Sequence, residues 1–564
     1  MGITSTMFTA LSGLDASQAR LDVAGNNIAN VNTTGFKGSR STFETQLSRS
    51  LSFGSPPSAE SGGTNPMQLG LGVGVASVDK DMGDGAVDPT GVNTHMAIQG
   101  GGFFVLQKGD GSQMFTRDGS FRLDETQKLV NSDGLAVMGY GVDSNFGLVA
   151  GSLTDLTVPV GRLSISQATT QTNFSGTLDS SGVVSATPST VTSEALVHTG
   201  GAVPIVGSTA LTAVSTASTP SVALFAPGDV LTLSAKKGGR SLPDATFTVT
   251  SAATADPNSG ATVDELTEWL EAKLGINSSV TQTPAAQVTV NSAGEIEVVG
   301  NLGPDSDIDV ELISSGAVGQ PMAWTAAQGD GTSTHTSFQV YDSLGNPVNV
   351  NMTFTLVDKS STGNTWRFYA ESPDDSDASP VVGTGTIKFD TSGFVSETSG
   401  TTITINRADT GAIDPLSVGM NFSAITGLNT DSNDGVRMTS QDGFPVGTLN
   451  DFAVGGNGTI KGLFSNGQNR TMGQVVLATF SNPEGLVDMG SNTFASGPNS
   501  GTPAIVTPGS MGSGQIMGRS LELSNVDITK EFVNIMTATT AFSSSGRVIS
   551  TSQQLLAELL QIVR

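Results

Sequence analysis

Few side chains of this chain are suited to catalysis. The 564 residues include no cysteine and three histidines, His95, His198 and His335. Thiolate nucleophiles, disulfides and zinc–thiolate sites are therefore excluded, and a histidine base would have few nucleophiles to activate. The sequence has no G-x-S-x-G, H-E-x-x-H, P-loop or G-x-G-x-x-G motif. We therefore expect no enzymatic activity, no bound cofactor and no metal site.

Clustered acidic residues fit a solvated surface better than a metal site. Acidic and apolar residues alternate along one stretch: Asp305, Asp307, Ile308, Asp309, Val310, Glu311 and Leu312. A calcium-binding loop would need glycine at position 310 and glutamate at position 316, whereas this chain has valine and glycine there. We therefore place these acids on the wet face of a strand and His335 on another strand. Three further acids are expected in a solvated loop, Asp374, Asp375 and Asp377.

The composition excludes several classes of partner. Lysine and arginine number 25 against 51 aspartates and glutamates, so the formal net charge is −26. Such a surface repels nucleic acid and anionic membranes, and neither is an expected partner. The chain has no run of 18 apolar residues, and its N-terminal stretch lacks the basic and apolar regions of a signal peptide. We expect no membrane insertion, and any export must use a route without a cleaved signal peptide.

Two apolar seams, one near each end of the chain, predict the long helices that organise the rest. Alternating steps of four and three residues join these C-terminal positions: Ile528, Phe532, Ile535, Thr539, Phe542, Gly546, Ile549, Gln553, Leu556, Leu560 and Val563. The same steps join these N-terminal positions: Ile3, Met7, Ala10, Leu14, Ser17, Leu21, Ala24, Ile28 and Val31. Ser524 with Asp527 fits a capping box that starts the C-terminal helix. Residues 528–563 would form a rod of roughly 54 Å, which needs a partner along its length.

Apolar stripes of this kind usually pack inside one molecule. Here both stripes are terminal, have few bulky aromatic residues and follow 3.5-residue spacing, so we favour packing between neighbouring copies. The side chains expected in subunit packing are Ile3, Met7, Leu14, Leu21, Ile28, Val31, Ile528, Phe532, Ile535, Phe542, Ile549, Leu556, Leu560 and Val563. We expect both ends to be disordered in an isolated chain and helical only in an assembly.

Turn signals between apolar runs predict antiparallel strands in the middle of the chain. Asp-Gly or Asn-Gly pairs occur at 110–111, 118–119, 133–134, 442–443, 457–458 and 466–467. Residues 336–356 alternate around a turn at 343–347, which indicates an antiparallel pair. One helix is expected in this region, with Thr262 and Glu265 as capping box, Gly275 as its end, and an apolar face of Leu266, Trp269, Leu270 and Leu274. The helical spacing of Phe43, Leu47 and Leu51 predicts a short amphipathic element in a linker.

The expected fold class is multidomain, with a coiled-coil root of the terminal α-helices and several mainly β domains inserted in nested order. The root comprises residues 1–37 and 515–564, followed by a linker at 38–75. The inner β domain comprises residues 76–150 and 436–514, and the middle β domain comprises 151–185 and 320–435. An outer β domain with one helix occupies residues 186–319.

An asparagine-rich segment after the first helix carries a family resemblance. Its residues are Gly25, Asn26, Asn27, Ile28, Ala29, Asn30, Val31, Asn32, Thr33, Thr34, Gly35, Phe36 and Lys37. This signature segment closely resembles the signature of the axial proteins of the bacterial flagellum, the rod and hook families. Residues 97–106 and 116–124 are also similar to these families, and residues 524–536, 541–542 and 547–551 look more like the hook family than the rod family. The chain departs from the family at Thr540, Ser545 and Gly546, where a glycine costs about 1 kcal/mol of helix propensity.

The resemblance implies a non-enzymatic subunit of the flagellar hook, a self-assembling curved tube that transmits torque from rod to filament. It also implies contacts with copies of the same chain, with distal rod, hook cap and hook–filament junction proteins, and with the flagellar export apparatus. The expected location is extracellular, in the hook and basal body. Two alternatives are a subunit of the distal rod and an extracellular adhesin-like surface protein that binds ligands through residues 186–319.

Overall fold

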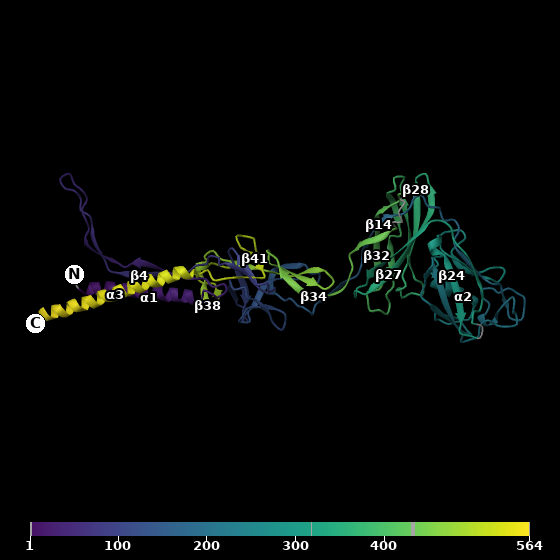
Figure 1. Ribbon diagram of the computed structural model, residues 1–564, viewed down its shortest axis with the longest axis horizontal. Helices are drawn as coiled ribbons and strands as arrows, with labels where there is room; N and C mark the ends of the chain where they lie inside the picture. The colour runs from purple at the N-terminus through teal and green to yellow at the C-terminus, as the bar shows by residue number, and fades with distance from the viewer. Residues whose placement is uncertain (1–2, 317–318, 430–434, 563–564) are drawn as a thin grey trace. The chain divides into compact units, whose positions relative to one another are not determined.

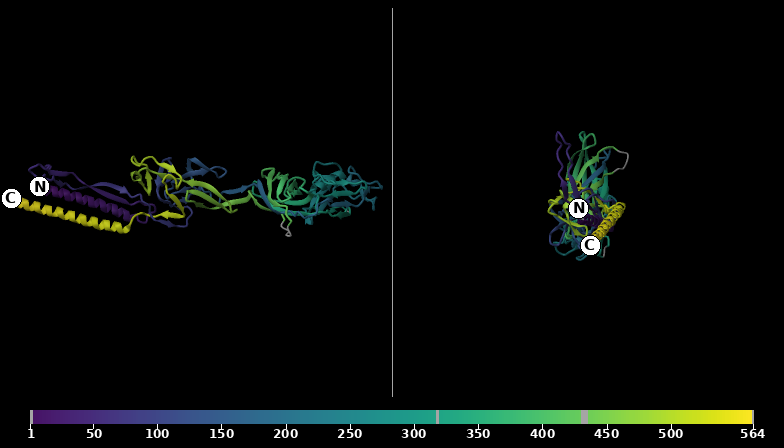
Figure 2. Two further views of the ribbon diagram at one scale, coloured as in Figure 1. Left: turned by 90° about the horizontal axis from the view of Figure 1, so that it is seen from above. Right: turned by 90° about the vertical axis from the view of Figure 1, so that its left-hand side faces the viewer.

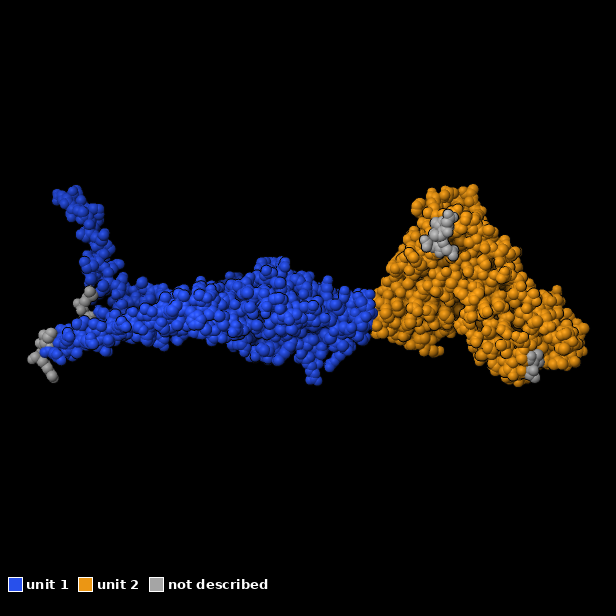
Figure 3. Space-filling view, in the orientation of Figure 1, with its two compact units in different colours: residues 1–164, 447–564 blue, residues 165–446 orange. Residues whose placement is uncertain are grey.

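The chain forms two compact units. The computed structural model describes residues 3–316, 319–429 and 435–562. Residues 1–164 and 447–564 make up unit 1, and residues 165–446 make up unit 2 (Figure 3). Unit 1 is therefore assembled from both ends of the chain. Among the described residues, no helix has the length and apolar character needed to cross a membrane.

Two long helices dominate one part of unit 1. Helix α1 (Ile3–Ala29) and helix α3 (Ile528–Ile562) lie side by side (Figure 2). Neither helix contains a proline, and each carries the apolar periodicity expected from the sequence. The prediction of two long helices at the ends of the chain is confirmed.

The start of α3 differs from the prediction. Asp527 caps the helix, because its Oδ1 accepts hydrogen bonds from the backbone N–H groups of Thr529 at 2.8 Å and Lys530 at 3.3 Å. The predicted capping box that begins at Ser524 is wrong. The Ser524 hydroxyl instead accepts a hydrogen bond from the Val526 N–H at 3.3 Å, since the helix begins too far along the chain for Ser524 to reach its first turn.

Residues 38–80 form extended hairpins. Two antiparallel strand pairs are present: β1 (Ser39–Thr45) with β4 (Val73–Lys80), and β2 (Ser48–Ser52) with β3 (Met67–Gly70). The predicted amphipathic element with helical spacing is therefore wrong, because this segment forms strands. Phe43 lies in β1 and Leu51 lies in β2, because pairing with the returning segment satisfies the backbone polar groups of this serine-rich stretch in an extended form.

The β part of unit 1 is made from both sides of the long middle region. Its central strands are β7 (Phe103–Gln107), β8 (Gln113–Thr116), β11 (Ala136–Val142), β12 (Leu148–Asp155), β34 (Phe444–Val454), β35 (Thr459–Phe464), β36 (Asn469–Val475), β37 (Leu477–Thr479), β38 (Val487–Gly490) and β39 (Thr493–Ala495). The turn signals at 110–111, 133–134, 457–458 and 466–467 each lie between paired antiparallel strands, as predicted. The strands on either side of 118–119 and of 442–443 do not pair with each other, so the prediction is wrong there. Phe103 and Phe115 lie in the core, where each meets Phe480 edge to face.

Two short strand pairs lead from this β part toward α3. They are β5 (Val87–Pro89) with β42 (Ser520–Glu522), and β6 (Met96–Gln99) with β41 (Gln515–Gly518). The segment that precedes α3 is thus paired with the segment that follows the β1–β4 hairpin.

Unit 2 contains a sandwich of two sheets. One sheet has β26 (Ser333–Tyr341), β27 (Pro347–Ser360), β28 (Gly363–Glu371), β29 (Val381–Phe389) and β30 (Val395–Ser399), and the other has β31 (Thr402–Ile405), β32 (Leu416–Thr426), β14 (Gln171–Thr177) and β33 (Arg437–Gln441). Apolar side chains of both sheets form one core, which includes Phe174, Phe354 and Phe422. The predicted antiparallel pair around residues 343–347 is β26 with β27 and is confirmed.

A second core in unit 2 surrounds one helix. The surrounding strands include β15 (Thr190–Ser193), β18 (Val230–Lys237), β20 (Ala245–Val249), β22 (Gln287–Val290), β23 (Ile296–Val299), β24 (Ile308–Ser314) and β25 (Trp324–Ala327). Helix α2 (Val263–Lys273) begins with the predicted capping box of Thr262 and Glu265, and Gly275 follows its end with a positive φ of 61°. Asp309 and Glu311 lie on the exposed face of β24, as predicted, whereas Asp305 and Asp307 precede the strand, so their predicted place on it is wrong.

The predicted combination of terminal helices with several mainly β domains is confirmed. The nested order and the exact domain boundaries remain predictions.

Candidate assembly interface

The two long helices meet along a row of small residues. On α1, Ala10, Ser17 and Ala24 are buried, and on α3, Ala538 and Ser552 are buried. A Cβ atom added at Gly13 would lie 3.1 Å from the Ser545 Oγ. Small side chains therefore set how closely the helix axes approach each other.

The predicted seam residues divide into two groups. Along α1, the side chains of Met7, Leu14, Leu21 and Ile28 are half-buried, and Val31 is half-buried just beyond the helix. Ile3 begins α1, but its side chain and residue Val563 lie outside the described part of the chain. The described larger side chains of the N-terminal seam are therefore all partly buried.

Only one row of the C-terminal seam faces α1. Ile535, Ile549 and Leu556 are half-buried and Phe542 is 37% exposed. The contact on α3 is completed by Ala538 and Ser552, which the predicted seam did not include. Ile528, which belongs to the same row, is 44% exposed, and in the other predicted row Phe532 is 54% exposed and Leu560 is 70% exposed.

The helix pair consequently keeps a large apolar surface in solvent. Exposed apolar side chains on α3 are Ile528, Phe532, Val533, Met536, Val548, Leu555, Leu559 and Leu560. On α1, Phe8 is 69% exposed and Leu11 is 46% exposed. Apolar surface of this extent is typical of a protein–protein contact.

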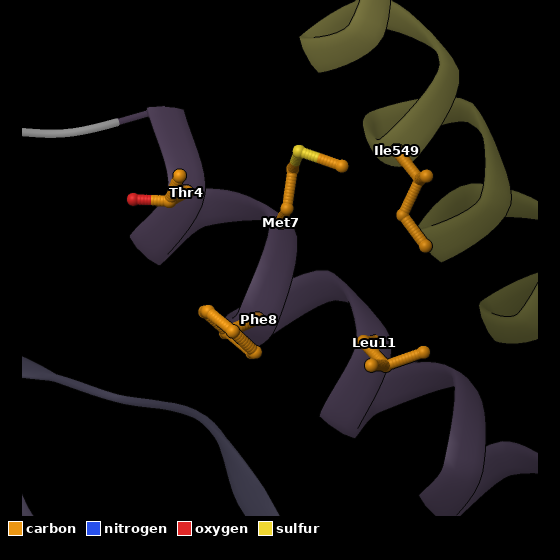
Figure 4. A pocket seen from close by; sticks show the side chains of 5 residues that line it. All are labelled: Thr4, Met7, Phe8, Leu11 and Ile549. Carbon is orange, nitrogen blue, oxygen red and sulfur yellow. The ribbon is translucent and has the colours of Figure 1, made fainter.

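An apolar groove opens between the two helices. Thr4, Met7, Phe8, Leu11 and Ile549 line it, and its volume is about 280 Å³ (Figure 4). Met7 and Leu11 point from α1 toward α3, and Ile549 points back from α3 (Figure 4). The groove is near the lower end of the size range of ligand pockets, roughly 300 Å³, and has almost no polar lining, so it suits an apolar side chain.

The signature segment ties the end of α1 to the start of α3. Asn27 is buried, and its amide donates to the Ser39 carbonyl oxygen at 2.8 Å and to the Glu531 Oε1 at 3.2 Å. The Asn27 Oδ1 accepts the Ser39 N–H at 2.9 Å. One asparagine therefore holds α1, β1 and the first turn of α3 together.

Glycine is required at position 35. Its φ is 67°, and a Cβ atom there would lie 2.6 Å from the backbone of Arg117. The Gly35 N–H donates to the Glu522 carbonyl oxygen at 2.8 Å. The end of the signature segment is therefore pressed against two other segments of unit 1.

A buried ion cluster lies at the end of the signature segment. The Lys37 Nζ is 2.6 Å from the Glu522 Oε1, and the Arg117 Nη1 is 3.2 Å from the Glu522 Oε2. All three side chains are at most 3% exposed. Burial, followed by the neighbouring Arg117 guanidinium, lowers the pKa of the Lys37 ammonium, and the Glu522 carboxylate opposes this. Lys37 was expected here as a signature residue, whereas nothing in the sequence indicated Arg117 or Glu522 as its partners.

The three histidines each have a threonine as a neighbour. Each histidine lies within 3.4 Å of a threonine hydroxyl: His95 with Thr90, His198 with Thr209, and His335 with Thr353. Within residues 3–316, 319–429 and 435–562, no group of three or more histidine, aspartate or glutamate side chains is arranged to hold a metal ion.

Comparisons with known proteins agree with this arrangement. Four family descriptions match: "Flagella basal body rod protein" at residues 7–37, "Flagellar hook protein FlgE/F/G D1 domain" at 97–186, "Flagellar basal body protein FlaE D2 domain" at 311–444, and "Flagellar basal body rod FlgEFG protein C-terminal" at 517–562. The chain belongs to the flagellar hook and rod protein family. The signature segment falls inside the first match, and α3 falls inside the last.

Several relatives that match nearly the whole chain are hook proteins. The flagellar hook protein of Treponema pallidum is 28% identical over 99% of both chains, and that of Salmonella typhimurium is 27% identical over 98% of both. The hook protein of Caulobacter vibrioides is 29% identical over the whole of both chains. A rod protein of Bacillus subtilis, FlgG, is 44% identical but matches 24% of this chain. This hook-family chain therefore resembles hook proteins throughout and a rod protein only in part.

Proposed function

We infer that this chain is the structural subunit of the bacterial flagellar hook. The observation that carries the inference is the full-length likeness to hook proteins, joined to a helix pair that leaves apolar surface exposed. The match to the rod protein FlgG covers 24% of this chain, so a distal rod subunit is not favoured. Nothing in the comparisons favours an adhesin.

We propose that the exposed rows of α1 and α3 pack against neighbouring copies. The predicted seam residues that turn away from the intramolecular contact, such as Phe532 and Leu560, supply this surface. Contacts between two different patches do not close on themselves and generate a helical polymer. The resulting tube transmits torque, while the β domains, which present glycine, serine, threonine and acidic surfaces, slide as the tube bends.

The proposed partners follow from the position of a hook between rod and filament. They are copies of the same chain, the distal rod, hook cap and hook–filament junction proteins, and the flagellar export apparatus. Export is proposed to proceed without a cleaved signal peptide. The nested domain boundaries given above are part of the same proposal.

Electron microscopy of the purified chain tests the inference. Wild-type chain, concentrated in physiological salt, should form curved tubes, and a variant that lacks residues 1–31 and 528–564 should form none. Straight rigid tubes would favour the rod alternative. A wild-type chain that stays monomeric at every concentration and salt would contradict the proposed function.

Amide hydrogen exchange tests the state of the ends before assembly. We expect fast exchange of residues 3–31 in a dilute monomer and strong protection in the polymer, because the neighbouring copies complete the packing of α1. Strong protection in the dilute monomer would show that the α1–α3 contact alone holds the helices.

A further inference from the structure

The β2–β3 hairpin is an arm that exposes large apolar side chains. The arm comprises residues 46–72, and it stands away from the helix pair in Figure 1. Leu47 is 85% exposed, Phe53 is 89% exposed and Met67 is 61% exposed. An isolated two-stranded hairpin is marginally stable in water, and burial of such side chains against another surface would stabilise it.

The arm is anchored at its base and free toward its tip. At the base, the Val73 N–H donates to the Ser12 Oγ at 3.2 Å, and the Gln46 N–H donates to the Gly72 carbonyl oxygen at 2.9 Å. Phe53 stands six residues beyond Leu47, roughly 20 Å along an extended strand. That distance exceeds the diameter of one helix, about 10 Å, so Phe53 can reach across to another molecule.

The charge distribution favours a second copy of this chain as the binding partner of the arm. The chain has a net charge of −26, so two copies repel each other except where their surfaces are neutral. The arm has one arginine and one glutamate, Arg49 and Glu60, and residues 3–14 of α1 have no charged side chain. Residues 548–557 of α3, which include Ile549, also have none. The arm and the groove are therefore surfaces that two acidic chains can bring together.

We propose that Phe53 of one copy inserts into the groove lined by Met7, Leu11 and Ile549 of a second copy. The groove is apolar and open, and Phe53 is the most exposed large apolar side chain of the arm. The arm's own base lies at Ser12, beside its own groove, and the arm stands away from the helix pair (Figure 1), which leaves Phe53 exposed and available to a neighbouring copy. This contact rests on the proposed function, because only a polymer presents a second copy at high local concentration.

Cysteine crosslinking tests the contact directly, because the chain has no cysteine of its own. Chains with Phe53→Cys and chains with Leu11→Cys are each mixed at low proportion into wild-type chain, polymerised and oxidised. We expect a covalent dimer that contains one chain of each variant. As a matched control, Val203→Cys, which alters a side chain 62% exposed in unit 2, replaces Leu11→Cys and should give no dimer with Phe53→Cys.

The two proposals fail in different ways. If wild-type chain forms tubes but Phe53→Cys yields no more dimer with Leu11→Cys than with Val203→Cys, the arm contact is overturned and the hook function stands. If wild-type chain forms no tubes, both the hook function and the arm contact are contradicted.

A second measurement does not depend on cysteine chemistry. Phe53→Ser should raise the concentration needed for polymerisation roughly tenfold or more, since a large buried aromatic side chain is lost. Val203→Ser should leave that concentration unchanged, and an equal effect of the two substitutions would also overturn the proposal.

Discussion

The buried cluster of Lys37, Glu522 and Arg117 contains two cations and one carboxylate. Removing Lys37 leaves Glu522 paired with Arg117, whereas removing the Glu522 carboxylate leaves two buried cations whose only remaining anion is the half-exposed Asp84 carboxylate, 3.5 Å from the Arg117 Nη1. We therefore predict that Glu522→Gln destabilises unit 1 by about 3–5 kcal/mol, and that Lys37→Met costs less. Urea unfolding followed by amide exchange of residues in unit 1 measures both. A larger loss for Lys37→Met would contradict this account of the cluster.

His335 predicts a pH dependence of unit 2. Burial, followed by the nearby Arg240 guanidinium, lowers the pKa of His335 to about 4, while Asp305 opposes the shift. Between pH 6.5 and 4 the unfolded chain binds a proton at this residue and the folded chain does not, so stability is lost as the pH falls through this window. The loss is at most about 3 kcal/mol.

Tryptophan fluorescence can follow this titration. All three tryptophans, Trp269, Trp324 and Trp366, lie in unit 2. Urea midpoints measured from pH 7 to pH 4 should fall for the wild-type chain and change less for His335→Gln. An identical pH dependence in both proteins would show that other groups carry it.

At the scale of the element, two glycines distinguish the faces of the helix pair. A Cβ atom at Gly546 would meet nothing within 4 Å, whereas one at Gly13 would press on Ser545. Gly546→Ala should therefore stabilise α3 by up to about 1 kcal/mol, and Gly13→Ala should not stabilise α1. Thermal unfolding followed by circular dichroism at the helix band compares the two. Equal stabilisation by both substitutions would mean that the helices do not approach closely at Gly13.

At the scale of the whole molecule, the net charge of −26 should make polymerisation depend on salt. Repulsion between acidic chains is screened over about 30 Å at 0.01 M salt and about 8 Å at 0.15 M. We predict that the concentration needed for polymerisation falls as salt rises over this range, as measured by sedimentation of the polymer. A rise with salt would instead indicate that ion pairs between copies dominate the contact.

Local patterns were enough to predict several elements of this protein. Apolar periodicity predicted α1 and α3, Thr262 and Glu265 predicted the start of α2, and alternation predicted the β26–β27 pair, because each signal lies within a few residues of the structure it specifies. The signature segment pointed to the family, which the full-length relatives then supported.

Contacts between distant segments were decided only by the tertiary structure. A heptad stripe has a row of residues on each side of it, and either row can be buried against a partner helix. In this structure the row with Ala538 and Ser552 is buried, whereas Phe532 and Leu560 stay exposed. Lys37 and Glu522 are 485 residues apart in sequence, so their contact depends on how both ends of the chain enter unit 1. The spacing of Phe43, Leu47 and Leu51 suggested a helix, but this segment pairs with the strands that return along it. Backbone hydrogen bonds between the paired strands outweigh a weak helical periodicity of the apolar residues.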